Sequence, residues 1–308
     1  MMQAHNVALK DLPNLLRDEL RPRREDDPPR YLYALLDMGR IQGELRKEVT
    51  NRLRRSASQA PILDHPEFKQ LKEHGPMLIY GLNLNGWKRD DNILLNEWGA
   101  CDGDTVSAWI VSELDKAALR LHLSQTMFAW DLNKSRYLMR YYDPLITPVL
   151  HRLADKQWKT WFFGPIISWW YPVATPQEET WARFEGGGEA QSSEAPQLII
   201  TEELWDAFKE DPLPYCLLNI IEQKFPSRFS SDCYGVRLAK VEDVLASGRK
   251  YGLKASEDLT FYVLALFEEP GRANDPRWQG AVRMAATSEE SLKTLLNNSE
   301  IYGTEQIS

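Results

Sequence analysis

The chain is poor in cysteine and has neither a long apolar run nor an excess of basic residues. Its three cysteines, Cys101, Cys216 and Cys233, are too few and too widely spaced for a disulfide framework or a zinc site. No stretch approaches the roughly 18 apolar residues of a membrane span. The N-terminus also lacks the apolar core of a signal peptide. We therefore expect a cytoplasmic protein with reduced thiols that does not enter a membrane.

The charge of the chain argues against nucleic acid as its main ligand. The net charge is −8, and residues 1–189 carry 25 Lys/Arg and 26 Asp/Glu whereas residues 190–308 carry 12 and 19. A phosphate-binding surface needs a sustained positive field, which this balance does not supply. The uneven distribution instead favours two lobes with different surfaces.

Sequence motifs for catalysis and for cofactor binding are also missing. The five histidines form no pair at ligand spacing with an acidic partner, and the chain contains no H-E-x-x-H, no G-x-S-x-G and no P-loop. The three glycines Gly186 to Gly188 follow no strongly apolar strand and open no basic helix, so they do not predict a phosphate cradle. We expect no cofactor and no metal.

Aromatic residues, by contrast, are concentrated in one stretch. Ten of the 33 lie between Tyr137 and Tyr171. Trp169, Trp170 and Tyr171 are consecutive, and neighbours on a strand point to opposite faces, so the three rings cannot all enter one core. They meet either a second layer of the same domain or a partner protein. Trp161, Trp169, Trp170 and Tyr171 are the candidate partner-binding residues.

The order of apolar runs and turn residues predicts an α/β (α+β) N-terminal domain with a mixed sheet, over residues 1–184. The predicted strands are 31–36, 77–81, 136–142 and 158–171, the last of them broken at Gly164-Pro165. Four helices are predicted. One follows the first strand and ends at about residue 55, a short one begins at His65-Pro66, and the other two span 109–123 and 144–153.

Residues 185–196 separate this domain from a different kind of sequence. They contain glycine, serine and proline without a large apolar residue, which is typical of a linker or an exposed loop. Beyond them, a helix start at Thr201 and apolar periodicity predict a mainly α-helical C-terminal lobe over residues 197–308. Its further predicted helices are 213–225, 236–251, 257–266 and 288–296.

Asp37, Arg140 and Asp143 form the best constellation of polar residues, because each lies at the edge of an apolar strand. If the strands are neighbours, Arg140 can bridge the two carboxylates and hold the strand ends in register. A catalytic interpretation would make the aspartates an acid–base pair. An arginine between them would instead keep both ionised. We therefore expect a structural polar cluster and no catalytic residues.

Four sequence blocks resemble a known family. Y-A-L-L-D (33–37), G-P-M-L-I-Y (75–80), L-M-R-Y-Y-D-P (138–144) and W-F-F-G-P (161–165) look like the signature of the type VI secretion effector chaperones, also called adaptor proteins. The segment 246–267 is similar to the helical region that often follows this domain. One departure is Leu145, where the family favours arginine after D-P.

The resemblance implies a bacterial, non-enzymatic protein. Such adaptors bind a cognate toxic effector in the cytoplasm and load it onto the VgrG-type spike of the secretion apparatus, and a cleft or paired surface of the two lobes would grip the effector. Two alternatives remain open at this stage. The chain could be a hydrolase that uses Asp37 and Asp143, or an immunity protein that blocks a toxin.

Overall fold

The computed structural model describes residues 6–21, 24–63, 65–81, 89–187, 194–209 and 211–302. The chain divides into two compact units, one of residues 1–173 with 179–210 and the other of residues 174–178 with 211–308. The first unit therefore extends beyond residue 184, and the start expected for the helical lobe at residue 197 lies inside it. Of the predicted linker 185–196, residues 188–193 lie outside the described residues.

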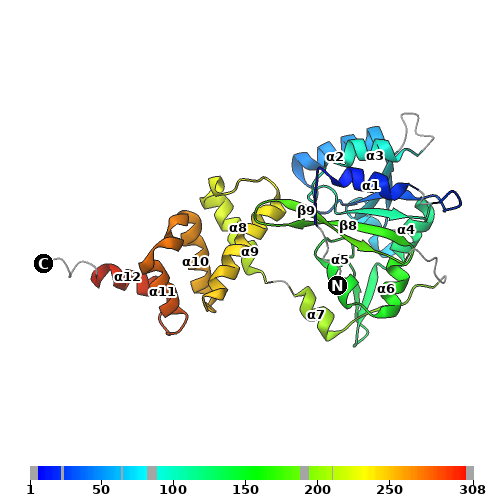
Figure 1. The fold of residues 1–308 in the computed structure, drawn as a ribbon. Helices are drawn as coiled ribbons and strands as arrows, with labels where there is room; N and C mark the ends of the chain where they lie inside the picture. Colours follow the sequence, from blue (N-terminus) through cyan, green and yellow to red (C-terminus); the bar gives the residue numbers. More distant parts are fainter. Residues whose placement is uncertain are drawn as a thin grey trace. The chain divides into compact units, whose positions relative to one another are not determined.

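A seven-stranded antiparallel sheet forms the centre of the first unit within the described residues (Figure 1). In sheet order its strands are β1 (Val7–Ala8), β9 (Glu179–Glu185), β8 (Ile166–Ala174), β5 (Ala108–Ser112), β2 (Tyr31–Asp37), β4 (Pro76–Gly81) and β3 (Ala57–Pro61). The strands predicted at 31–36 and 77–81 are confirmed as β2 and β4. They pair with each other, and β2 also pairs with β5.

Helices cover both faces of this sheet (Figure 1). The helices on one face are α1 (Leu12–Leu20), α2 (Gly43–Ser56) and α3 (Asp91–Trp98). Those on the other are α4 (Lys116–Ser124), α5 (Ile146–Leu153) and α6 (Lys156–Phe163). Consequently β2 is apolar on both sides: Leu32 and Leu36 enter one core, and Tyr33 and Leu35 enter the other.

A smaller, mixed sheet completes the first unit. Its strands are β10 (Leu198–Ile200), β6 (Phe128–Asp131) and β7 (Arg136–Leu138), with β10 parallel and β7 antiparallel to β6. Helix α7 (Glu202–Phe208) follows β10, and the Thr201 hydroxyl accepts the Leu204 N–H at its start. The predicted class, an α+β domain with a mixed sheet before a helical region, is confirmed.

Three predicted elements of the first unit were wrong in type or length. Residues 109–123 are not one helix, because Trp109 to Ser112 continue the buried strand β5 and α4 begins only after its cap Asp115. Residues 158–171 begin as α6, where Trp158 and Phe162 stack one helical turn apart with ring centroids at 4.7 Å. The strand expected over 136–142 ends at Leu138.

The second unit is helical and has a core of its own. Its elements are α8 (Leu213–Lys224), the 3₁₀ turn η2 (Pro226–Arg228), α9 (Tyr234–Lys250), α10 (Ser256–Glu268), the 3₁₀ turn η3 (Pro270–Asn274), α11 (Pro276–Ala285) and α12 (Leu292–Tyr302). Helix α11 was not predicted, although its start carries a capping Asp275 and Pro276 in the first turn. The helix expected at 288–296 begins at Leu292, whose N–H bonds the buried Asp258 carboxylate at 2.8 Å.

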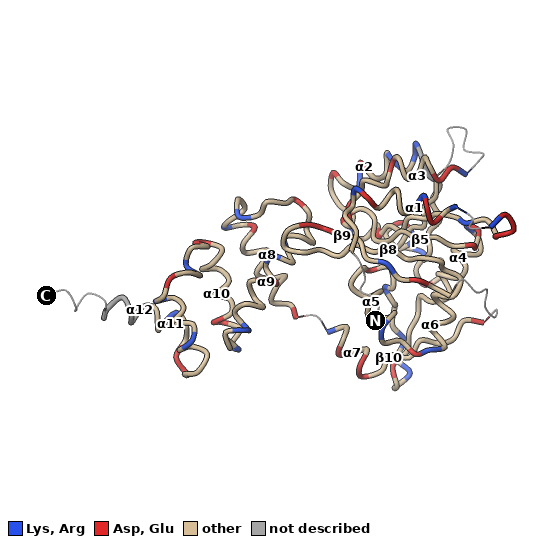
Figure 2. The backbone as a smooth tube through the Cα atoms, in the orientation of Figure 1, with Lys and Arg blue, Asp and Glu red and all other residues tan. Residues whose placement is uncertain are grey.

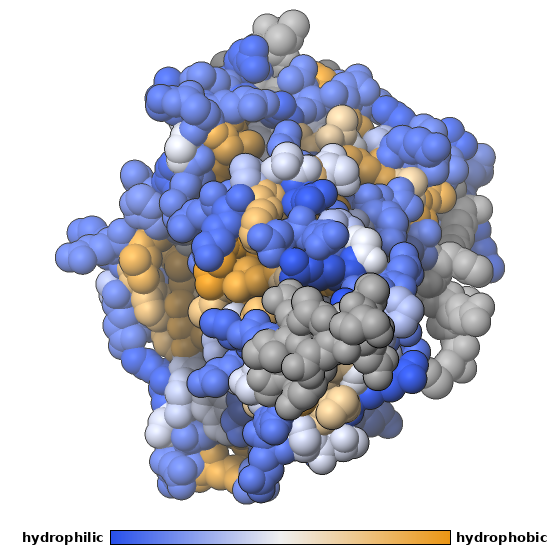
Figure 3. Space-filling view, turned by 90° about the vertical axis from the view of Figure 1, so that its left-hand side faces the viewer, coloured by the Kyte–Doolittle hydropathy of each residue, from blue (hydrophilic) through white to orange (hydrophobic). Residues whose placement is uncertain are grey.

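Charged residues of both signs are interspersed along both units (Figure 2). Residues 211–308 carry 11 Lys/Arg and 14 Asp/Glu, so much of the acidic excess of residues 190–308 belongs to residues before 211. The face in Figure 3 is mainly hydrophilic, with small apolar areas between the polar side chains. No described helix combines the length and the apolar character that a membrane crossing requires.

Candidate functional site

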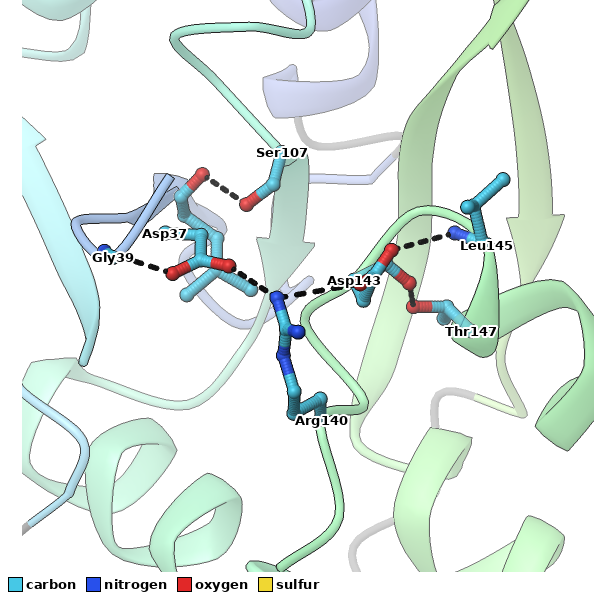
Figure 4. A network of polar contacts seen from close by, with 8 residues as sticks. Asp37, Gly39, Ser107, Arg140, Asp143, Leu145 and Thr147 are labelled. Atoms are coloured by element: carbon cyan, nitrogen blue, oxygen red, sulfur yellow. Dashed lines mark hydrogen bonds and ion pairs between the residues drawn. The ribbon is translucent and has the colours of Figure 1, made fainter. Parts of the chain in front are cut away.

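The structure brings Asp37, Arg140 and Asp143 together (Figure 4). Asp37 is the last residue of β2, and the other two residues lie in the turn between β7 and α5. The turn is held by the Asp143 N–H, which donates to the Arg140 carbonyl at 2.9 Å. This bond brings the arginine and the aspartate, three residues apart, to the same side of the turn.

One nitrogen of Arg140 contacts both carboxylates. Its Nη2 lies 2.9 Å from Asp37 Oδ2 and 3.4 Å from Asp143 Oδ2. The side chain of Asp37 is only 6% exposed and that of Asp143 16%, whereas that of Arg140 is 48% exposed. The arginine is thus the solvent-facing member of the cluster, and the Asp37 contact is the shorter and the more buried of the two.

Backbone donors occupy the remaining carboxylate oxygens. Gly39 N–H donates to Asp37 Oδ1 at 3.0 Å, and Leu145 N–H donates to Asp143 Oδ1 at 3.1 Å (Figure 4). The Thr147 hydroxyl donates to the Tyr141 carbonyl and, at 3.1 Å, to the Asp143 carbonyl. The cluster therefore joins the end of β2 to the start of α5, and both of its acids are hydrogen-bonded.

The electrostatics follow from this geometry. Partial burial disfavours the charged form of Arg140, but Asp143 and Asp37 outweigh it and raise the pKa of the guanidinium. Burial, together with the nearby Asp37 charge, raises the pKa of Tyr142 to about 12, and the Arg140 guanidinium lies 5.8 Å from the centre of that ring. The guanidinium thus occupies the position between the two carboxylates.

The aromatic candidates lie elsewhere than expected. Trp161, Trp169 and Trp170 are between 0% and 4% exposed, and Tyr171 is partly buried against the same core as Trp169. Trp169 enters the core beneath α4 to α6, whereas Trp170 enters the core beneath α1 to α3. Because both faces of the sheet are covered, these three tryptophans stabilise two cores. In this structure the three tryptophan side chains are therefore covered by the same unit and are not exposed to a partner.

A second polar network, centred on Glu19, was missed at the sequence level. The Glu19 carboxylate, at the end of α1, accepts hydrogen bonds from the Ser168 hydroxyl, from Trp170 Nε1 at 3.2 Å and from Arg183 Nε at 2.7 Å. It thereby ties α1 to β8 and β9. These partners are distant in the sequence, so no local spacing could have indicated the network.

A cation among tyrosines was also missed. The Arg89 guanidinium lies 4.9, 4.6 and 5.4 Å from the ring centres of Tyr31, Tyr33 and Tyr80, and its Nε is 2.9 Å from Asp91 Oδ1. This arrangement fixes the segment before α3 against β2 and β4. The alternation of Tyr31 and Tyr33 along β2 could have indicated that the two rings share one face of the strand. It could not have indicated that Arg89 lies against them.

Possible metal ligands are dispersed within each unit. Taken unit by unit, the residues that the structure describes bring no three histidine, cysteine or acidic side chains within mutual ligand distance. The Asp37 cluster supplies two carboxylates but already contains a cation, Arg140.

Comparison with known proteins gives one match. The matching family is described as a domain of unknown function (DUF4123), and the match spans residues 32–160. It begins within β2, includes Asp37, Arg140 and Asp143, and ends within α6. No curated protein and no solved structure matches the chain. Residues 32–160 are thus a DUF4123 domain, and the first unit extends beyond it to include α1 and β1 before it and β8, β9, β10 and α7 after it.

Proposed function

We propose that this chain is a non-enzymatic adaptor that binds a type VI secretion effector in the bacterial cytoplasm and delivers it to the VgrG-type spike. The observation that carries the proposal is an overlap. Three of the four blocks that resemble the adaptor family, at 33–37, 75–80 and 138–144, lie inside the DUF4123 domain, and the fourth begins just after it.

The role of the most specific block supports a binding protein over an enzyme. Within R-Y-Y-D-P, Arg140 and Asp143 join β2 to α5, Tyr141 is fully buried, and Tyr142 is 4% exposed. The block therefore serves the architecture of the domain. A signature of this kind preserves a scaffold whose surface can vary with the partner.

The test is co-expression of the chain with each toxin gene that neighbours it, followed by size-exclusion chromatography. We expect one toxin to co-elute with the chain and to be recovered in greater soluble yield than when it is expressed alone. A parallel gene deletion should stop secretion of that toxin while the spike protein is still secreted. Elution of every candidate toxin apart from the chain at micromolar concentration would contradict the proposal.

The same experiments separate the two alternatives. An immunity protein would protect cells that express the toxin internally, and its deletion would make the strain sensitive to its own kin. A hydrolase would lose turnover in a well-folded Asp143→Asn variant without losing any partner. Glu97→Gln, which changes an exposed acid of the same unit, is the matched control for charge.

A further inference from the structure

The helical unit contains a groove that lies outside the DUF4123 domain. One wall is lined by residues at four-residue spacing: Asp243 and Ser247 of α9, and Tyr251, the residue that caps its C-terminus. Such spacing places them on one face of the helix, along about 12 Å of its length. Tyr262 of α10 and Trp278 of α11 form the floor.

The floor of the groove is apolar and rigid. Tyr262 and Trp278 are 2% and 4% exposed, and their rings stack with centroids 5.7 Å apart. The Tyr262 hydroxyl is 3.2 Å from the Ser247 hydroxyl, which fixes the ring against α9. Tyr251 stands at one end with 43% of its surface exposed. The ring stacking and the hydroxyl contact therefore hold the floor in place.

Asp243 makes the groove asymmetric in charge. Its side chain is exposed, and in the described part of the chain its carboxylate has neither a hydrogen bond nor an ion pair. Lys240, one turn earlier on α9, does not neutralise it, because the Lys240 ammonium donates to the Arg228 carbonyl at 2.6 Å. Arg249 is likewise paired with Asp211. An unpaired negative charge therefore stands beside an apolar floor.

The size of the groove limits what it can hold. Its volume is about 180 Å³, which is below the roughly 300–1,000 Å³ of small-molecule sites. A single long side chain fits such a space. Lysine and arginine combine an apolar stem with a charged head, which matches an apolar floor that ends in a carboxylate.

We propose that this groove binds one lysine or arginine side chain of a partner protein, with the stem on the Tyr262 floor and the cation at Asp243. The groove is thereby a binding determinant of the helical unit. The partner need not be a secreted effector, so the proposal stands or falls independently of the adaptor function.

The test uses small probes on the full chain labelled with 3-fluorotyrosine. N-acetyl-arginine methylamide and N-acetyl-lysine methylamide are titrated to tens of millimolar, alongside the citrulline derivative, which keeps the shape of arginine but has no charge. The ¹⁹F resonance of Tyr251, assigned by its loss in Tyr251→Phe, reports binding. We expect both basic probes to shift it and to bind about two- to fivefold more tightly than citrulline, as befits a solvent-exposed ion pair.

Asp243→Asn should abolish the preference for arginine over citrulline and leave citrulline binding unchanged. Glu289→Gln removes the same net charge from an exposed position outside the groove and should preserve the preference. The proposal is overturned if the basic probes fail to shift the Tyr251 resonance, if citrulline binds as tightly as arginine, or if the preference survives in Asp243→Asn.

Discussion

Replacing Asp37 with asparagine should destabilise the first unit by about 1–2 kcal/mol, because screening by water brings the loss to the low end of the roughly 1.5–3 kcal/mol of a hydrogen bond to a charged group. The asparagine keeps the shape and an oxygen that can accept the Gly39 N–H. It loses the charge that faces Arg140 at 2.9 Å. Breaking a fully buried ion pair costs about 3–5 kcal/mol of stability. The Arg140 side chain is 48% exposed, however, so water screens this pair and the loss is smaller.

Asp143→Asn should cost less than about 1 kcal/mol, which makes the ranking of the two variants the sharper test. Its contact to Arg140 is longer, at 3.4 Å, its side chain is more exposed, and an asparagine can still accept the Leu145 N–H. Arg140 also keeps its shorter contact, to Asp37, in this variant.

Urea unfolding followed by tryptophan fluorescence measures both variants. Ten of the 11 tryptophans precede residue 211, so the signal reports mainly on the first unit. Glu97→Gln, an exposed acid, should stay within about 0.5 kcal/mol of the parent. If Asp143→Asn proved as costly as Asp37→Asn, or if both matched the control, the cluster would not hold β2 to α5 in the way described.

Three further outcomes are expected. Burial lowers the pKa of His122 below its ordinary 6.5, so the unfolded chain binds a proton at this site more tightly than the folded chain does. The stability that comes from the neutral, buried imidazole is complete above pH 6.5 and is lost as the pH falls below it. The free energy of unfolding in urea should therefore be lower at pH 5.5 than at pH 7.5, and this difference should be smaller in the His122→Gln variant. Glu19→Gln should lower the free energy of unfolding by about 1–3 kcal/mol, and amide hydrogen exchange should become faster in α1 than in the other helices. Unchanged exchange in α1 would refute the anchoring role of Glu19. Trp169→Ala should lower the free energy of unfolding by about 3–5 kcal/mol, because this ring is fully buried. Trp205 is 37% exposed, so Trp205→Ala should lower it clearly less in the same urea assay.

The parts of the fold that the sequence predicted are those where a local pattern decides the structure. The apolar run of β2 and the capping Thr201 of α7 were read correctly because burial and capping act over a few residues. The segment 109–123 failed for the opposite reason. Apolar residues of a fully buried strand can imitate one face of a helix, so periodicity could not separate β5 from α4.

The candidate site shows the same division. Arg140 and its two aspartates were expected together because each ends an apolar segment, which is a local signal. The aromatic run left two interpretations open, a second layer of the same domain or a partner surface, because the sequence does not tell how many layers cover a sheet. Trp170 is buried by α1, which lies more than a hundred residues earlier in the chain. Long-range packing of this kind leaves no trace in the spacing of residues.

The Glu19 network also has a consequence for the order of folding. Glu19 and Ser168 are 149 residues apart, and Arg183 is farther still. During synthesis, α1 leaves the ribosome early but can complete its contacts only after β8 and β9 have emerged. Contacts so distant in sequence form slowly. The apolar side of α1 can pack on β2 and β5 once residue 112 has emerged, but Glu19 has none of its partners until β8 and β9 follow, and in that interval the unfinished sheet is exposed to aggregation or to capture by a general chaperone.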